Sequence, residues 1–384
     1  MKLTTIIFLV LIFAGGLYAQ NQDSLNSKPA STNIVGAEYP RIDAQRRAYF
    51  RVHAPEAQSV EVSLGHTALT KGADGYWTGT TEPLDPGFHY YTLRIDGADV
   101  ADPGSETFFG AGRVMSGIEV PEEGVDFYDV KNVPHGEVRS HWYFAKSTGE
   151  MRHAYIYTPP GYDQNNDKRY PVLYLQHGMG EDRRAWSNQG HANFILDNLI
   201  AEGKAKPMIV VMEDGGIAGG FGGGRRRGGP GQGGPGGGAF WDGFGSVMVK
   251  DIIPMVDETY RTIPDRDHRA MAGLSLGATQ TYGITQANLD KFAYIGIFSA
   301  PFGFPGIEKG YNGLLSKPDE FNKEVKVFYI SMGSKEGART GRSIHEELQK
   351  AGINHVYFEA PGTAHEFQTW RKSLHGFAQL LFQN

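Results

Sequence analysis

The sequence predicts an α/β chain in which a small antiparallel β-sandwich precedes a doubly wound, mostly parallel sheet. Two observations carry this prediction. From about residue 140 onward, short apolar segments such as 170–178 alternate with helical segments, the pattern of a parallel sheet covered on both faces. Before residue 120, short alternating segments follow one another without a helical period, which is typical of a small sandwich.

The composition allows a large core and excludes some classes of function. The chain has 384 residues, of which 40% are hydrophobic and 12% aromatic, enough for two domains. Its formal net charge of −6 gives no reason to expect nucleic-acid binding. Because the chain has no cysteine, neither a disulfide nor a cysteine-based zinc site is possible.

The N-terminal residues have the pattern of a signal peptide, predicted over residues 1–19. Lys2 is followed by an apolar run at 6–13, and Ala19 precedes a plausible cleavage point. A membrane anchor is the alternative, but the apolar run is short for a span, so no stable membrane insertion is expected after cleavage. A polar leader follows at 20–38. Together with the lack of cysteine, this pattern predicts a secreted or periplasmic bacterial protein.

The predicted sandwich module spans residues 39–120. Its alternating segments are followed by Asp96-Gly97, a hairpin signal; the segments lie at 47–54, 59–64, 75–80 and 87–95. Trp77 and Tyr90 either stack on sugar or belong to the core of a structural spacer. Residues 121–139 are predicted to be a polar linker.

The catalytic-type domain is predicted over residues 140–384. Its expected strands lie at 151–158, 170–178, 208–212, 268–272, 293–299, 325–331 and 355–359, and its expected helices at 194–201, 247–260, 278–284, 341–351 and the C-terminal end. One segment breaks the pattern, because 15 of the 24 residues at 215–238 are glycine. This insertion follows a strand, at the sheet edge where ligands bind. A flexible lid over substrate and an insertion without a role both remain open.

The most specific motif is Gly-x-Ser-x-Gly at residues 273–277. It lies between an expected strand and an expected helix, the context of a nucleophile elbow, in which a strained serine at a sharp turn exposes its hydroxyl. Glycines flank the serine because side chains there would collide with a neighbouring strand or helix. Ser275 is therefore the predicted nucleophile, and the N–H of Leu276, at a helix N-terminus, a predicted oxyanion donor. With the sheet, this motif gives the α/β-hydrolase pattern.

The base and the acid are predicted from chain order, which in such folds runs serine, acid, histidine, each following a strand. Among the four histidines after Ser275, His365 lies in the loop directly after the last expected strand. Glu336 is the only carboxylate in the loop after strand 325–331 and is the predicted acid. Asp290 and Asp319 remain alternatives, although neither follows a strand.

A second oxyanion donor is expected from a loop after an early strand. The run His177-Gly178-Met179-Gly180 matches a His-Gly type of loop. Its Met179 N–H is the first choice, with Gly178 next, and Gly178 is also expected against the substrate. Trp370, five residues after His365, either lines the acyl pocket or packs within the last helix.

These motifs resemble those of bacterial feruloyl and acetylxylan esterases of carbohydrate esterase family 1, which are related to esterase D and the mycolyltransferases. The resemblance rests on YPVLYLQHG at 170–178, DIIP at 251–254, HRAMAGLSLG at 268–277 and GTAHEFQTW at 362–370. Residues 39–120 resemble the immunoglobulin-like module ahead of catalytic domains in glycogen-branching enzymes and some bacterial esterases, through FRVHAP at 50–55, GYW at 75–77, PGFHYY at 86–91 and DP at 102–103. Such modules are often called carbohydrate-binding. Glu336, where aspartate is expected, and the glycine-rich insertion depart from the family pattern.

The resemblance implies a secreted serine esterase that needs no metal or cofactor and acts on ester-decorated plant cell-wall polysaccharide. Feruloyl release is the first choice and acetyl release the second. Acyl transfer or lipid-ester hydrolysis is another enzymatic possibility. A carbohydrate-binding protein whose hydrolase domain has lost activity is a further alternative, which the departure at Glu336 leaves open.

Overall fold

The computed structural model describes residues 26–216, 239–300, 304–337 and 339–383. The predicted signal peptide, the start of the leader and residues 217–238 of the glycine-rich insertion lie outside the described residues. The chain divides into two compact units, the first made of Met1–Phe108 and Val114–Gly124, the second of Phe109–Arg113 and Val125–Asn384. In the described ranges, no helix combines the length and the apolar character that crossing a membrane requires.

The first unit consists of antiparallel sheets. Their strand orders are β1-β2-β3-β7-β6, β10-β9-β4-β5 and β11-β12-β8. The strands are β1 (Lys28–Pro29), β2 (Arg41–Ile42), β3 (Ala48–His53), β4 (Val60–Val62), β5 (Thr67–Ala68), β6 (Thr70–Lys71), β7 (Tyr76–Thr80), β8 (Gly87–Tyr91), β9 (Leu93–Ile95), β10 (Ala98–Val100), β11 (Thr107–Gly110) and β12 (Arg113–Val120).

Local residue chemistry explains the details of this unit. Asp96 and Gly97 have φ values of 48° and 87°, so the predicted hairpin turn between β9 and β10 is confirmed. The single strand expected at 87–95 is interrupted at Thr92, because β8 and β9 pair in different sheets. Trp77 is 7% exposed, and its Nε1 donates to the Ala54 carbonyl at 2.9 Å, so it is a core residue.

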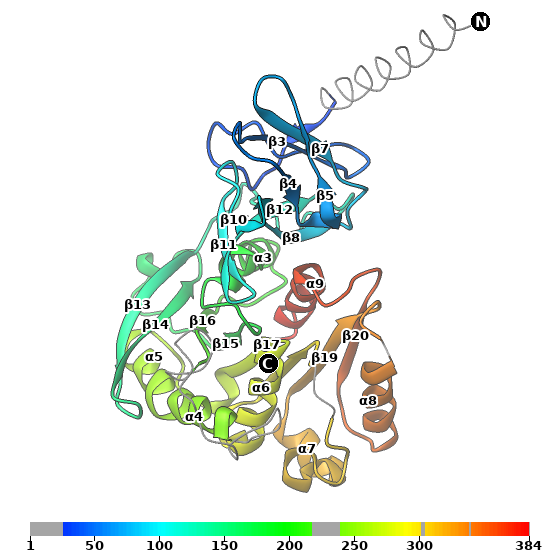
Figure 1. The fold of residues 1–384 in the computed structure, drawn as a ribbon. Helices are drawn as coiled ribbons and strands as arrows, with labels where there is room; N and C mark the ends of the chain where they lie inside the picture. The colour runs from blue at the N-terminus through cyan, green and yellow to red at the C-terminus, as the bar shows by residue number, and fades with distance from the viewer. Residues whose placement is uncertain (1–25, 217–238, 301–303, 338, 384) are drawn as a thin grey trace, which may run out of the picture. The chain divides into compact units, whose positions relative to one another are not determined.

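The second unit contains one eight-stranded sheet in the order β13-β14-β16-β15-β17-β18-β19-β20. The pairs β13–β14 and β14–β16 are antiparallel. The remaining neighbours in this order, from β16 through β15 to β20, pair in parallel. Their bounds are β13 (Glu137–Ala145), β14 (Glu150–Thr158), β15 (Val172–Gln176), β16 (Ile209–Glu213), β17 (Arg269–Leu274), β18 (Tyr294–Phe298), β19 (Val327–Gly333) and β20 (Val356–Ala360). The predicted fold class, antiparallel sheets followed by an α/β-hydrolase sheet, is confirmed (Figure 1).

Helices cover both faces of this sheet. The pair α3 and α9 packs together on one face, and α4 to α8 lie on the other (Figure 1). The helices are α2 (Ala185–Asn188), α3 (Ala192–Ala201), α4 (Ala239–Val247), a π-helical segment (Met248–Ile252), α5 (Ile253–Thr259), α6 (Leu276–Ala287), α7 (Pro318–Glu324), α8 (Arg339–Lys350) and α9 (Phe367–Ala378). The helix expected at 247–260 is thus the π-helical segment followed by α5, and α4 precedes it in the chain.

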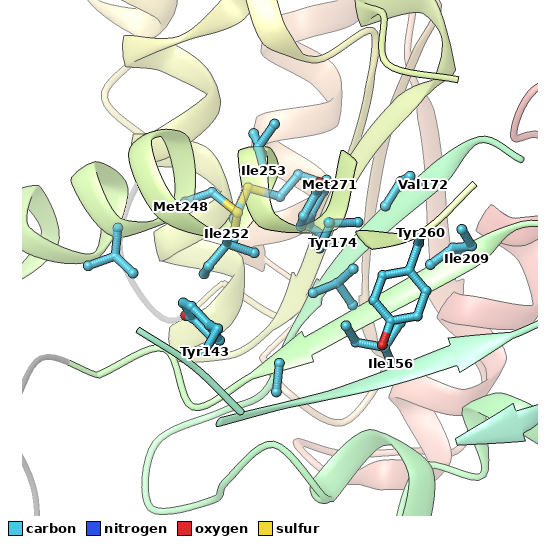
Figure 2. Close-up of a cluster of buried hydrophobic side chains, with 14 of the residues drawn as sticks. Tyr143, Ile156, Val172, Tyr174, Ile209, Met248, Ile252, Ile253, Tyr260 and Met271 are labelled. Atoms are coloured by element: carbon cyan, nitrogen blue, oxygen red, sulfur yellow. The ribbon is translucent and has the colours of Figure 1, made fainter. Parts of the chain in front are cut away.

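A hydrophobic cluster fixes the sheet against the helices from α4 to α5 (Figure 2). Tyr174 and Met271 come from the central strands β15 and β17, and Met248 and Ile252 come from the π-helical turn; all four are fully buried. Burial of such a side chain contributes about 1.5–3 kcal/mol. The cluster therefore anchors the strand whose end carries the elbow.

The sheet begins earlier than the sequence indicated. Strand β13 starts at Glu137, inside the range expected to be a polar connection. The sequence does not reveal this start, because β13 is an edge strand whose first side chains need not be buried. Val138, Arg139 and Ser140 stay at least partly accessible to solvent.

Candidate active site

The chain reverses sharply at Ser275, between β17 and α6. Ser275 has φ 51° and ψ −116°, a conformation that costs about 1–3 kcal/mol and is held by surrounding contacts. A Cβ on Gly273 would lie 2.4 Å from the Gly277 backbone, and one on Gly277 would lie 2.5 Å from the His177 carbonyl oxygen. The Ser275 N–H donates to the Phe298 carbonyl at 2.9 Å. Backbone contacts on three sides therefore hold the strained turn.

The structure brings Ser275, His365 and Glu336 together in one hydrogen-bonded chain. His365 Nε2 lies 2.9 Å from Ser275 Oγ, and His365 Nδ1 lies 2.7 Å from Glu336 Oε2. Because Nδ1 faces a carboxylate it carries the ring proton, which leaves Nε2 to accept from the serine hydroxyl. The imidazole side chain is 44% exposed and the Glu336 side chain 7% exposed. This is the geometry of an activated nucleophile, with an oriented base between serine and carboxylate.

The second carboxylate oxygen of Glu336 is held by two donors. Ser299 Oγ donates to Oε1 at 2.7 Å, and the Gly333 N–H donates to the same oxygen at 2.6 Å. The Ser299 hydroxyl in turn accepts from Trp370 Nε1 at 3.0 Å. Ser299 is 1% exposed and has φ 52°. The carboxylate is therefore fixed at both oxygens before any substrate binds.

Trp370 packs against the His365 ring. Its side chain is 5% exposed, and its ring meets the His365 ring edge-on at 5.1 Å. Of the two possibilities that the sequence left open, these contacts favour packing over a position in an open acyl pocket.

The His-Gly loop lies against the elbow. A Cβ on Gly178 would lie 3.4 Å from Ser275 Cβ, so Gly178 borders the nucleophile. The Gly178 N–H donates to Glu181 Oε2 at 2.9 Å, which leaves Met179 as the candidate donor of this loop. His177 is buried, and its Nε2 lies 2.9 Å from the Asp214 carbonyl oxygen. The ring therefore braces the loop.

A turn from earlier in the chain supports the same loop. The Gly112 N–H donates to the Gly180 carbonyl at 2.8 Å. Gly180 has φ 78°, and a Cβ there would lie 2.8 Å from the Gly112 nitrogen. Gly180 thus serves both a left-handed conformation and a close backbone approach.

A buried ion pair fixes the chain where the glycine-rich insertion begins. Arg152 Nε lies 2.6 Å from Glu213 Oε1, Arg152 Nη2 donates to the Gly216 carbonyl at 2.6 Å, and the Gly215 N–H donates to Glu213 Oε2 at 2.7 Å. Burial works against the charge of Arg152, but the hydrogen bond and the charge of Glu213 raise the pKa of the guanidinium above its ordinary value. Breaking such a pair leaves an uncompensated buried charge.

Neither Ser299 nor Glu181 is among the site residues that the sequence indicates. Ser299 follows the strand next to the elbow strand, at the carboxyl edge where polar side chains gather, and this position is the one signal that could have found it. Among the described residues, no group of three or more histidine, aspartate and glutamate side chains is arranged to hold a metal ion.

Comparisons with known proteins identify the second unit. Residues 145–380 match the family described as "Putative esterase". A relative from Xylanibacter ruminicola, named endo-1,4-beta-xylanase/feruloyl esterase, is 41% identical over 367 residues. The match covers 92% of this chain and 47% of that protein, so the chain spans about half the length of this relative.

Solved structures show the same fold. A carbohydrate esterase family 1 ferulic acid esterase from the anaerobic fungus Anaeromyces mucronatus is 26% identical, with a TM-score of 0.54 over 67% of this chain and 96% of that chain. The enterobactin esterase of Shigella flexneri is 14% identical, with a TM-score of 0.61 over 88% of this chain and 93% of that chain; at that identity the likeness concerns the fold alone. The chain therefore belongs to the esterase family.

Proposed function

We propose that this protein is a serine esterase that releases feruloyl groups from plant cell-wall polysaccharide such as arabinoxylan. The observation that carries the proposal is the continuous hydrogen-bonded chain from Ser275 through His365 to Glu336. The relative named as a xylanase/feruloyl esterase supports the choice of acyl group and of polysaccharide.

In the proposed mechanism Ser275 Oγ attacks the ester carbonyl while its proton passes to His365 Nε2. The tetrahedral oxyanion is stabilised by the N–H groups of Leu276 and Met179. Collapse breaks the bond to the sugar oxygen, which takes the proton from His365 and leaves as the alcohol. Water then attacks the acyl-serine by the same proton transfers, releasing ferulic acid and restoring the Ser275 hydroxyl.

Glu336 is the proposed acid of the triad. Its Oε2 keeps the His365 ring oriented and stabilises the imidazolium that forms during attack. The Glu336 carboxylate lies one methylene further from the backbone than that of an aspartate. It still fits this role, because Ser299 and Gly333 hold Oε1 while Oε2 meets the His365 ring.

The protein is further proposed to act outside the cytoplasm, secreted or periplasmic in a bacterium. The support is the sequence of residues 1–19, with a positive start, an apolar run and a small residue before the expected cleavage point. N-terminal sequencing of the protein exported by its host tests this point, and a mature chain that still begins at Met1 would contradict it.

One assay series tests the proposed reaction. Purified protein is given methyl ferulate, acetylated xylan and p-nitrophenyl acetate, with Ser275→Ala as the control. We expect ferulate release that falls by roughly 10⁴- to 10⁶-fold in the variant. Equal rates for the two proteins would sink the proposal.

The same series separates the remaining alternatives. Acetate release from xylan without ferulate release would assign an acetylxylan esterase instead. Transfer of the acyl group to an added alcohol in preference to water would assign an acyltransferase. Retention on arabinoxylan with no turnover of any ester would leave a carbohydrate-binding protein.

A further inference from the structure

The β13–β14 hairpin presents apolar side chains to solvent on one face. Trp142 is 61% exposed, Phe144 56% and Met151 58%. Trp142 lies directly opposite His153 and Phe144 directly opposite Met151, so all four share this face, as does Tyr155 two residues further along β14. We call Trp142, Phe144, Met151, His153 and Tyr155 the aromatic platform. Exposed apolar side chains that gather in one patch mark a binding surface, whereas single exposed apolar residues are normal on a protein surface.

The indole of the platform is held flat. The Trp142 and His153 rings are stacked, with centroids 4.1 Å apart and an interplanar angle of 15°. His153 is buried beneath the indole, and its Nε2 lies 2.6 Å from Ser140 Oγ. One indole face is therefore covered by imidazole, and the exposed 61% of the side chain presents the other face to solvent. A rigid, preoriented ring loses little freedom when it binds a flat ligand.

The platform lies toward the carboxyl ends of the parallel strands, the same end of the sheet as Ser275. Ala154 pairs with Glu213, the last residue of β16, so Met151 and His153 extend past the carboxyl end of that strand. Three strand spacings separate β14 from β17, roughly 15 Å. A ligand that occupies both the elbow and the platform must therefore be longer than a single aromatic acyl group.

Two arginines beside the platform are each paired with an aspartate. Arg183 lies 3.1 Å from Asp214 and Arg184 lies 2.5 Å from Asp182, and the Arg183 guanidinium also lies over the Tyr155 ring at 5.7 Å. The surface thus combines flat apolar rings with hydrogen-bonding groups and compensated charge. It is complementary to an uncharged polymer with apolar ring faces and hydroxyl edges.

We propose that the aromatic platform is a subsite for the polysaccharide backbone, at which a pyranose ring stacks on Trp142 while the ester borne by the same polymer reaches Ser275. The subsite rests on the proposed function, because it concerns the sugar part of that substrate. Contacts connect the two places through Arg183, Asp214 and His177. The site therefore selects polymeric over small esters by adding contacts remote from the reacting bond.

The test compares Trp142→Ala and Trp142→Tyr with Val130→Ala, a control at another exposed apolar residue of the same unit. Each is assayed with methyl ferulate and with feruloylated arabinoxylan. Trp142→Ala is expected to raise KM for the polymer roughly 3- to 10-fold, the size of one lost aromatic contact, and to leave methyl ferulate unchanged. Trp142→Tyr, which keeps a flat ring, is expected to recover most of the loss. Equal behaviour of all variants on the polymer overturns the subsite.

Other outcomes are equally decisive. Parallel losses on both substrates would make Trp142 a structural residue, and a concentration-dependent dimer disrupted by Trp142→Ala would make the platform a contact with a second copy of this chain. If the wild-type protein hydrolyses neither ester, the proposed function fails, and the subsite is then judged by affinity electrophoresis in soluble arabinoxylan. Retardation of wild type but not of Trp142→Ala supports the subsite, and equal mobility overturns it.

Discussion

Replacement of Ser299 by alanine tests whether the fixed carboxylate matters for catalysis. The change removes one of the two donors to Glu336 Oε1, the 2.7 Å hydrogen bond from the serine hydroxyl, and keeps the 2.6 Å bond from the Gly333 N–H. A hydrogen bond to a charged group is worth about 1.5–3 kcal/mol. If that energy holds Glu336 against the His365 ring, kcat/KM for methyl ferulate falls roughly 10- to 100-fold.

The same change also affects stability. It leaves Trp370 Nε1 without its acceptor in a side chain that is 5% exposed, which costs about 1–3 kcal/mol of unfolding free energy. The assay therefore needs a variant that loses a buried hydroxyl without touching Glu336. Ser331→Ala provides it, since Ser331 is 2% exposed and its hydroxyl donates to Ser373 at 2.8 Å.

Ser299→Ala and Ser331→Ala together distinguish a loss of catalysis from a loss of stability. Both are expected to unfold at lower urea concentration than the wild type, and only Ser299→Ala is expected to lose catalysis. A loss of kcat/KM in Ser299→Ala no larger than that in Ser331→Ala would refute a positioning role for Ser299.

Three further predictions follow from the geometry. Glu336→Gln is expected to lower kcat by about 10³- to 10⁴-fold, because an amide favours the wrong tautomer of His365; full activity in steady-state assays would remove Glu336 from the triad. Gly277→Ala is expected to destabilise by roughly 2–4 kcal/mol, since its Cβ would meet the His177 carbonyl, while Gly283→Ala in the same helix, with nothing within 4 Å, is expected to stabilise slightly; similar urea midpoints for the two would contradict this. Burial lowers the pKa of His355 and of His375 in the folded protein. Because the unfolded chain then binds more protons at these two groups, the free energy of unfolding is expected to fall as pH drops through about 6.5. Urea midpoints at pH 7.5 and 5.5 measure this fall, and His355→Gln should reduce the difference between the two midpoints.

The fold could be predicted because its signals are local. Continuous apolar strands such as 208–212 are long enough to identify without tertiary information, and the strand–turn–helix around Ser275 has its own glycine pattern. Chain order then directed attention to His365 and Glu336, which the structure brings within hydrogen-bonding distance of each other.

The features that could not be predicted depend on contacts between segments that are distant in the sequence, or on backbone details without a sequence signal. Ser299 is an ordinary serine in the sequence, and its importance arises only because the loop carrying Glu336 folds back over the end of β18. Strand β13 escaped because an edge strand alternates between buried Tyr143 and exposed Trp142 after a polar start, and such a segment resembles a linker. The π-helical turn at Met248–Ile252 likewise has no local sequence mark, because it is one added residue within an apolar helix.

The end of β18 has a mechanical consequence for the triad. The Phe298 carbonyl accepts from the Ser275 N–H, and the next residue, Ser299, donates to Glu336. The proposed nucleophile and the proposed acid are thus tied to two adjacent residues, the last residue of β18 and the one that follows it. We therefore expect a displacement of that strand to carry Ser275 and Glu336 together, so that the span His365 bridges in the proposed triad changes little.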